Sequence, residues 1–271
     1  MTRKIGMCTW IMGETSLEDI AVRTRKAGLD GVELFGDIDR VDPVEAARTF
    51  TDEGLEIFSI TPADADISHP DPRLRDAALD YYRALMKFAA AIGNPIVSCH
   101  GQVGRIEPVS TQAEEDRLLT DAVSRIGGFA AEYGLSVVFE VLNRYETHQI
   151  RTVAEGLTLL ERVQADNLRL LPDAYHMNIE EADPAEALLA AGNAIGLYHA
   201  ADSNRCAIGE GHIAFAKQIR SLDRIGYSGP IILETNAPGP NPFTPDKGPG
   251  FRDKVELQLT RSVGALRAFS A

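Results

Sequence analysis

The chain of 271 residues has few cysteines, few basic residues and no long hydrophobic run. Its three cysteines, Cys8, Cys99 and Cys206, are odd in number and lack zinc-finger spacing, so we expect free thiols in a reducing compartment and no structural zinc. No run of about 18 apolar residues occurs, and the N-terminal MTRKIGMCTW lacks the apolar core of a signal peptide, which argues against membrane insertion or export. We therefore expect a cytoplasmic protein that does not bind membranes.

Positive charge is also scarce. The chain holds 27 Lys and Arg against 40 Asp and Glu, which gives a formal net charge of -13. Such a charge repels phosphate backbones, so nucleic acid is not an expected partner. Hydrophobic residues at 44% and charged residues at 25% are typical of folded globular proteins, and no linker-like stretch divides the chain. A single domain over residues 1–271 is predicted.

Short runs rich in Val, Ile and Leu alternate with longer segments of helical period, a pattern typical of parallel strands joined by crossover helices. The predicted strands are 4–9, 31–35, 56–60, 95–100, 136–142, 168–172, 196–199 and 230–234. The predicted helices are 17–27, 44–52, 72–91, 111–133, 153–164, 184–191, 214–225 and 252–269. The eight strands and eight helices predict an α/β fold of the closed (β/α)8 TIM barrel type. An open dinucleotide-binding sheet is disfavoured, because no GxGxxG follows the first strand.

One stretch of the chain has low complexity. Residues 236–250, NAPGPNPFTPDKGPG, contain five prolines and cannot form a helix or a strand. The stretch directly follows the last predicted strand, so it is either a solvated connection or a semi-rigid flap over the mouth of the barrel. We predict a flap at the active site.

In such a barrel, functional side chains come from the C-terminal ends of the strands. Four successive predicted strands end in Glu140, Asp173, His199 and Glu234. An acid within an apolar run is costly as a free buried charge, so it demands a counter-charge. Three carboxylates and one imidazole suit a hard divalent cation, Mn²⁺ first and Mg²⁺ or Co²⁺ next, better than structural zinc. The alternative is that each acid pairs with an arginine or caps the following helix.

Four segments in the second half of the chain, FEVLNRYE, DAYHMNIEEAD, HAADSNR and ILET, resemble motifs of the ketose 3-epimerases. This group acts on D-tagatose, D-psicose and L-ribulose and belongs to the xylose-isomerase-like barrel superfamily. The resemblance implies a homodimer or homotetramer and a metal held by Glu140, Asp173, His199 and Glu234. It further implies that three side chains reach substrate oxygens: Glu146, His176 and Arg205.

Inverting a carbon beside a ketone requires removal of a weakly acidic proton and its return to the opposite face, so two acid/base groups must flank the carbon. Glu140 and Glu234 can form that pair. The predicted reaction is inversion of C3 of a small-molecule sugar, a free ketose, through a cis-enediolate that the metal stabilises. A phosphorylated sugar is the less favoured alternative, for which GEGH at 209–212 would supply backbone N–H groups.

Other polar side chains are weaker candidates. His100, at the end of the fourth predicted strand, is expected to line the substrate pocket or to pack at the strand terminus. Glu33 is expected to support the site without binding the metal directly. Trp10 and Phe35 could form an apolar wall for the sugar, with core packing as the alternative. His69 and His148 lie in polar loops and are expected to be exposed. Arg205 could instead pair with Glu210 on the surface.

Three other functions remain open. An aldose–ketose isomerase of the hydroxypyruvate type would use the same metal and carboxylates. A non-catalytic sugar-binding protein would keep the barrel but has no need for two glutamates around a metal. A zinc endonuclease of the apurinic type is disfavoured, because it requires further histidine ligands and a basic face for DNA. The segments IGMCTW and FGDIDRVDP differ from the 3-epimerase pattern, and the sequence does not specify the sugar.

Overall fold

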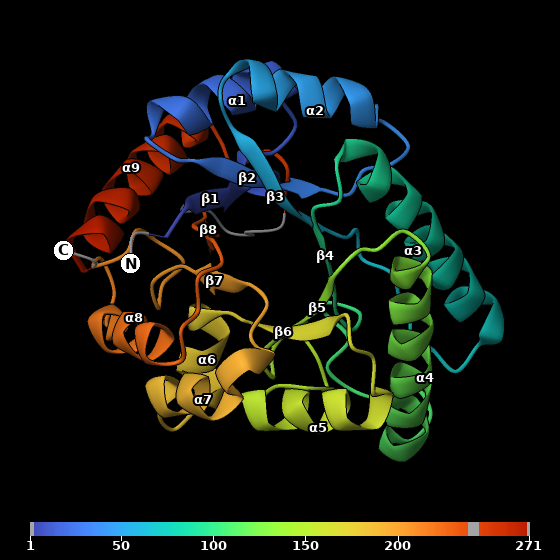
Figure 1. Ribbon diagram of the computed structural model, residues 1–271. Helices are drawn as coiled ribbons and strands as arrows, with labels where there is room; N and C mark the ends of the chain where they lie inside the picture. The colour runs from blue at the N-terminus through green and yellow to red at the C-terminus, as the bar shows by residue number, and fades with distance from the viewer. Residues whose placement is uncertain (1–2, 238–243, 270–271) are drawn as a thin grey trace.

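Eight parallel strands form a ring with helices outside it in a computed structural model that describes residues 3–237 and 244–269 (Figure 1). The strands are β1 (Ile5–Cys8), β2 (Gly31–Phe35), β3 (Glu56–Thr61), β4 (Ile96–Cys99), β5 (Val137–Val141), β6 (Leu168–Pro172), β7 (Tyr198–Ala200) and β8 (Ile231–Leu233). They are hydrogen-bonded in the order β6-β5-β4-β3-β2-β1-β8-β7. Isolated bridges from Leu170 to Ile195 and from Asp173 to His199 nearly close the barrel. The predicted (β/α)8 fold is confirmed.

The helices follow the strands. They are α1 (Leu17–Lys26), α2 (Pro43–Asp52), α3 (Pro72–Ile92), α4 (Gln112–Ala131), α5 (Val153–Val163), α6 (Ala174–Glu180), α7 (Pro184–Ala191), α8 (Phe215–Arg224) and α9 (Phe251–Phe269), with short 3-10 helices η1 (Thr9–Met12) and η2 (Gly192–Ala194). The sequence pattern does not predict α6, because its seven residues are too few to display an apolar period. The Asp173 carboxylate caps α6 by accepting a hydrogen bond of 2.6 Å from the Tyr175 backbone N–H.

Local sequence signals explain where the elements begin. Asp71 caps α3 and is followed by Pro72 in the first helical turn, while Thr152 and Glu155 form a reciprocal capping box at α5. The first residue of β2 is Gly31, where a Cβ would lie 2.1 Å from the backbone carbonyl oxygen of Glu56. Only glycine therefore allows β2 to approach β3 this closely.

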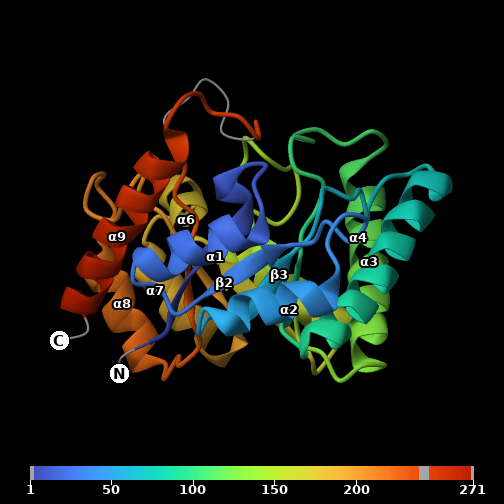
Figure 2. The same ribbon diagram turned by 90° about the horizontal axis from the view of Figure 1, so that it is seen from above.

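The C-terminal ends of the strands and the loops that follow them lie at one edge of the barrel. Figure 2 shows residues 244–250, which lead into α9, at the same edge as the loop between β4 and α4. Thr244 and Pro245 belong to the predicted flap and line a cavity there together with Val103. Residues 238–243 of the predicted flap lie outside the described residues, and the flap stays a prediction. None of the helices in the described part of the chain has the length and hydrophobicity needed to cross a bilayer.

Candidate active site

Four buried side chains meet at the C-terminal ends of β5 to β8. Glu140 lies in β5, Asp173 directly follows β6, His199 lies in β7 and Glu234 directly follows β8. One potential ligand atom from each lies within 4.8 Å of those of the other three. The fold thus brings together the four residues that the sequence singled out. The bridge between Asp173 and His199, which helps to close the barrel, also places these two side chains next to each other.

The imidazole of His199 lies at the centre of this group. Its Nδ1 is 3.5 Å from Glu140 Oε1, 3.5 Å from Glu234 Oε2 and 4.0 Å from Asp173 Oδ2. Among the described residues, neither ring nitrogen has a partner in hydrogen-bond geometry, although both are fully buried. A buried nitrogen without a hydrogen bond, facing three carboxylates at such distances, fits a divalent cation bound between them.

Glu33 contacts His199 from the other side of the ring. The Nε2 of His199 lies 3.1 Å from Glu33 Oε1, and Ser59 donates a hydrogen bond of 2.7 Å to Glu33 Oε2. Burial lowers the pKa of His199, but Glu33, Glu140 and Glu234 outweigh it and raise that pKa well above its ordinary value. The ring thus presents Nε2 to Glu33 and Nδ1 to the other three carboxylates, which is the arrangement that a supporting residue would require.

Arg205 places a positive charge inside the group of acids. Its Nη1 donates to Asp173 Oδ2 at 3.0 Å and to Glu234 Oε2 at 2.7 Å, and its guanidinium stacks 4.3 Å from the centre of the Tyr175 ring. Burial raises the pKa of Glu234, but Arg205 and His199 overcome this and hold the pKa well below its ordinary value. The alternative partner, Glu210, instead pairs with Arg261. Arg205 is thus part of the site and not a surface arginine.

The three other residues predicted to bind substrate, Glu146, His176 and His100, line the cavity at the mouth of the barrel together with Arg205. This cavity has a volume of about 780 Å³. Asn143, which the sequence reasoning did not single out, joins two of them. Its Nδ2 donates to Glu146 Oε1 at 2.9 Å and lies 2.7 Å from His176 Nδ1. The position of Asn143 in the NRYE segment was the available signal.

Trp10 has a polar contact that the sequence reasoning missed. Trp10 and Phe35 line the cavity as expected, but the Trp10 indole also donates a hydrogen bond of 2.9 Å from Nε1 to Glu234 Oε1. Two donors, Trp10 and Arg205, therefore hold the two oxygens of Glu234. Asp64 is a further acid in the cavity wall that the sequence reasoning missed, and partial desolvation by the surrounding protein raises its pKa.

The predicted exposure of His148 is wrong. Its side chain is 5% exposed, and Nε2 lies 3.2 Å from Glu115 Oε2 on α4. The polar residues around it indicated a solvated loop, whereas the loop after β5 packs against α4 and the loop after β4.

Comparison with known proteins defines the class of this fold and site. Residues 22–257 match the family described as the xylose isomerase-like TIM barrel. The chain therefore belongs to this family, and the resemblance recognised in its motifs is confirmed.

Among its relatives, the chain is 31% identical over 221 residues to an L-ribulose 3-epimerase of Methylomonas sp. (strain DH-1), covering 78% of this chain and 75% of that protein. It is 32% identical over 219 residues to a ketose 3-epimerase of Arthrobacter globiformis, covering 79% and 75%. The structure of an L-ribulose 3-epimerase superimposes with a TM-score of 0.87 at 24% identity, covering 99% of this chain and 94% of that chain. Since such relatives are named epimerases, the chain is an enzyme of the isomerase class.

Proposed function

We propose that the protein is a divalent-metal-dependent epimerase that inverts C3 of a free ketose. The observation that carries the proposal is the pair of buried glutamates, Glu140 and Glu234, each with an oxygen 3.5 Å from the same nitrogen of His199. The names of the relatives support the reaction, since they include L-ribulose, D-psicose and ketose 3-epimerases.

The donor set fits a hard cation, with three carboxylates and one imidazole. A divalent cation held by Glu140, Asp173, His199 and Glu234, Mn²⁺ first and Mg²⁺ or Co²⁺ next, would supply Lewis-acid stabilisation of the negative charge that develops on the substrate.

The two glutamates move the proton. One carboxylate removes the proton from C3, and the electron pair of that bond forms the C2–C3 double bond of a cis-enediolate while negative charge passes to the C2 oxygen. The other glutamate, in its protonated form, delivers a proton to the opposite face of C3, and the C2 carbonyl is restored. Each turnover exchanges the protonation states of Glu140 and Glu234, so exchange with solvent resets the pair. This predicts that hydrogen from water enters at C3.

Side chains around this pair position the sugar. Arg205 and His176, with Nη2 and Nε2 3.4 Å apart, face the cavity as donors to sugar oxygens. Glu146 offers a carboxylate to a sugar hydroxyl, and His100 lies in the same wall. Since Arg205 already binds two carboxylates and Asp64 and Glu146 are acidic, the cavity favours an uncharged ketose over a sugar phosphate.

A second candidate is epimerisation at a neighbouring carbon of a larger sugar. The chain is 26% identical over 220 residues to a 3-dehydro-D-guloside 4-epimerase of Escherichia coli, covering 78% of this chain and 83% of that protein. Aldose–ketose isomerisation by the same carboxylates is a third candidate. We further propose a cytoplasmic homodimer or homotetramer.

Deuterium incorporation tests the proposal. The purified protein is stripped with EDTA, reloaded with Mn²⁺, and incubated in D₂O with L-ribulose, D-psicose or D-tagatose while NMR follows C3 and C1. We expect deuterium at C3 and the C3 epimer with metal, and neither without it. Deuterium at C1 with aldose formation would favour the isomerase, and no exchange with any sugar would reject catalysis on these ketoses. Near wild-type turnover by Glu140→Gln or Glu234→Gln would reject the two-glutamate mechanism.

A further inference from the structure

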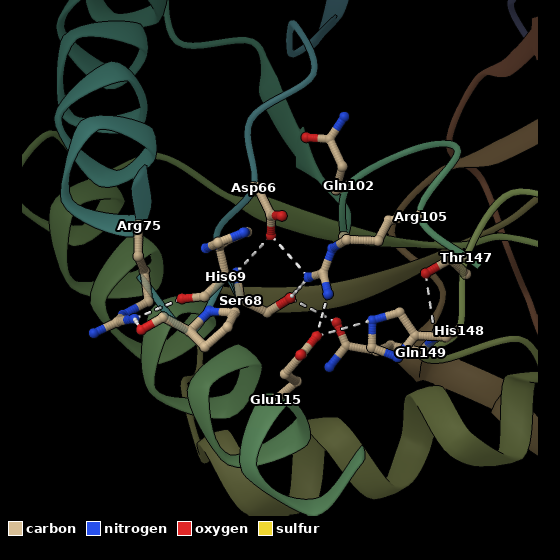
Figure 3. Close-up of polar contacts among 12 residues, drawn as sticks. Asp66, Ser68, His69, Arg75, Gln102, Arg105, Glu115, Thr147, His148 and Gln149 are labelled. Carbon is tan, nitrogen blue, oxygen red and sulfur yellow. Dashed lines mark hydrogen bonds and ion pairs between the residues drawn. The ribbon is translucent and has the colours of Figure 1, made fainter. Parts of the chain in front are cut away.

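Three loops at the mouth of the barrel are joined by a single arginine. They follow the neighbouring strands β3, β4 and β5 and comprise residues 62–71, 100–111 and 142–152. Arg105, in the loop after β4, extends its side chain between the other two loops and α4 (Figure 3). We refer to Asp66, Ser68, Arg105, Glu115 and Gln149 as the Arg105 cluster. The mechanism proposed above does not use it.

The guanidinium of Arg105 bonds to several elements at once. Its Nη2 donates to Asp66 Oδ1 at 2.9 Å and to Ser68 Oγ at 2.7 Å, while its Nη1 donates to Glu115 of α4. Ser68 in turn connects the loop after β3 to the loop after β5, because its hydroxyl donates a hydrogen bond of 2.7 Å to Gln149 Oε1 (Figure 3). One side chain thus ties the loops after β3 and β5 to α4.

The backbone of Arg105 is joined to the loop that carries Glu146. Arg105 and Thr147 form an isolated parallel bridge, and the N–H of His148 donates to the carbonyl of Arg105 at 3.1 Å. The N–H of Gly104 donates to the carbonyl of Glu146 itself at 2.7 Å. These bonds hold the backbone from which the Glu146 side chain extends, and that side chain lines the cavity.

Burial and charge make an arginine necessary at this position. The Arg105 side chain is 13% exposed, that of Asp66 is 15% exposed and Glu115 is fully buried. Without the guanidinium, two carboxylates of low exposure lose their shared cation, so the loops must separate or admit water. Lysine has one compact charged group and cannot hold two carboxylates in a forked arrangement. Burial first and then Arg105 lower the pKa of the neighbouring His148 imidazole, so the guanidinium is the group that supplies the positive charge between Asp66 and Glu115.

We propose that Arg105 is a positioning residue that sets the affinity for the ketose by holding Glu146 in the cavity wall. The inference rests on the proposed function for its substrate. It adds a residue that does not touch the reacting atoms and a loop arrangement on which substrate binding depends. If Arg105 only stabilised the fold, replacing it would lower the melting temperature, and its effect on KM would not depend on Glu146.

The test combines a double-mutant cycle with a matched control. The variants are Arg105→Met, Glu146→Gln, the combination of both, and Arg105→Lys as the conservative replacement. The control is Arg117→Met, since Arg117 lies on α4, is 65% exposed and pairs with Glu114 at 2.8 Å. KM and kcat are measured on the full-length, Mn²⁺-loaded enzyme with the sugar of the panel that it epimerises fastest, and melting temperatures are recorded for all variants.

We expect Arg105→Met to raise KM about tenfold with a smaller change in kcat, Arg105→Lys to lie between it and the wild type, and Arg117→Met to change neither. In the combined variant, KM should stay within about twofold of that of Glu146→Gln alone, because an effect transmitted through Glu146 disappears once Glu146 is replaced. Independent, multiplying effects would overturn the proposal, as would an equal rise of KM in Arg117→Met.

Hydrogen–deuterium exchange separates this inference from the proposed function, because it requires no turnover. In the absence of sugar, backbone amides of residues 142–152 should exchange faster in Arg105→Met and Arg105→Lys than in the wild type or in Arg117→Met. Unchanged exchange in both Arg105 variants would overturn the positioning role. If the wild type epimerises no ketose, the proposed function fails and the exchange result alone decides the inference. Arg105→Lys keeps the test available if Arg105→Met does not fold.

Discussion

Replacing Trp10 by phenylalanine tests how firmly Glu234 must be held. The variant keeps an aromatic ring in the cavity wall but removes the Nε1–H that donates to Glu234 Oε1 at 2.9 Å. A hydrogen bond to a charged group contributes about 1.5–3 kcal/mol, which corresponds to a change of about 10- to 150-fold. Arg205 still holds the other oxygen of Glu234 at 2.7 Å, so we expect a loss in kcat near the lower limit, about tenfold.

The assay for Trp10→Phe is steady-state kcat with saturating Mn²⁺, together with the rate of deuterium entry at C3. The matched control is Phe35→Leu, because Phe35 lines the same cavity without a hydrogen bond to Glu234. A kcat within twofold of the wild type, or an equal loss in Phe35→Leu, would refute the reasoning. The first result would show that the carboxylate needs no second donor, and the second would assign the loss to the shape of the cavity.

Three further predictions concern the metal, pH and the barrel. Removal of the metal with EDTA should abolish turnover and lower the melting temperature, and Mn²⁺ should restore both; scanning calorimetry with an unchanged melting temperature would contradict a cation at this site. Burial lowers the pKa of His148, so protonation favours the unfolded chain below pH 6.5, and His148→Gln should lose less of its free energy of unfolding on acidification than the wild type. Urea unfolding at a series of pH values measures this, and equal losses would oppose it. Gly31→Ala places a Cβ 2.1 Å from the Glu56 carbonyl oxygen and should prevent folding, whereas Gly264→Ala, with open space at its Cβ position, should fold; a soluble, native Gly31→Ala would show that β2 and β3 can separate.

The barrel could be predicted from the sequence because its signals are local. Apolar runs and helical periods mark the strands and most helices, and a parallel barrel then requires successive strands to present their C-terminal ends at one edge. Glu140, Asp173, His199 and Glu234 follow from this topology without knowledge of any distance. The roles predicted for Glu146, His176 and Arg205 came from the family resemblance, because two of these residues lie in loops and His176 lies in the short helix α6.

Contacts between separate loops could not be predicted in the same way. The bond from Trp10 to Glu234 joins residues 224 positions apart, and the contact between His148 and α4 depends on how the loop after β5 folds back. A polar segment is exposed only when its side chains have no buried polar partners. His148 has one, the buried carboxylate of Glu115. A pattern within one segment contains no information about a partner in another.

The seam between β6 and β7 connects the stability of the barrel to the candidate metal site. Every other neighbouring pair of strands in the described sheet is joined by a ladder of two or more paired residues, whereas β6 meets the β7 side through isolated bridges, one of which is Asp173 to His199. The side chains of these two residues both face the cluster of ligand atoms. A cation bound there would cross-link the neighbouring strands of the described sheet that no continuous ladder joins. Metal loss should therefore increase amide exchange first in β6 and β7, before the ladders that join β1 through β5 open, since local opening begins where the strand pairing is least continuous.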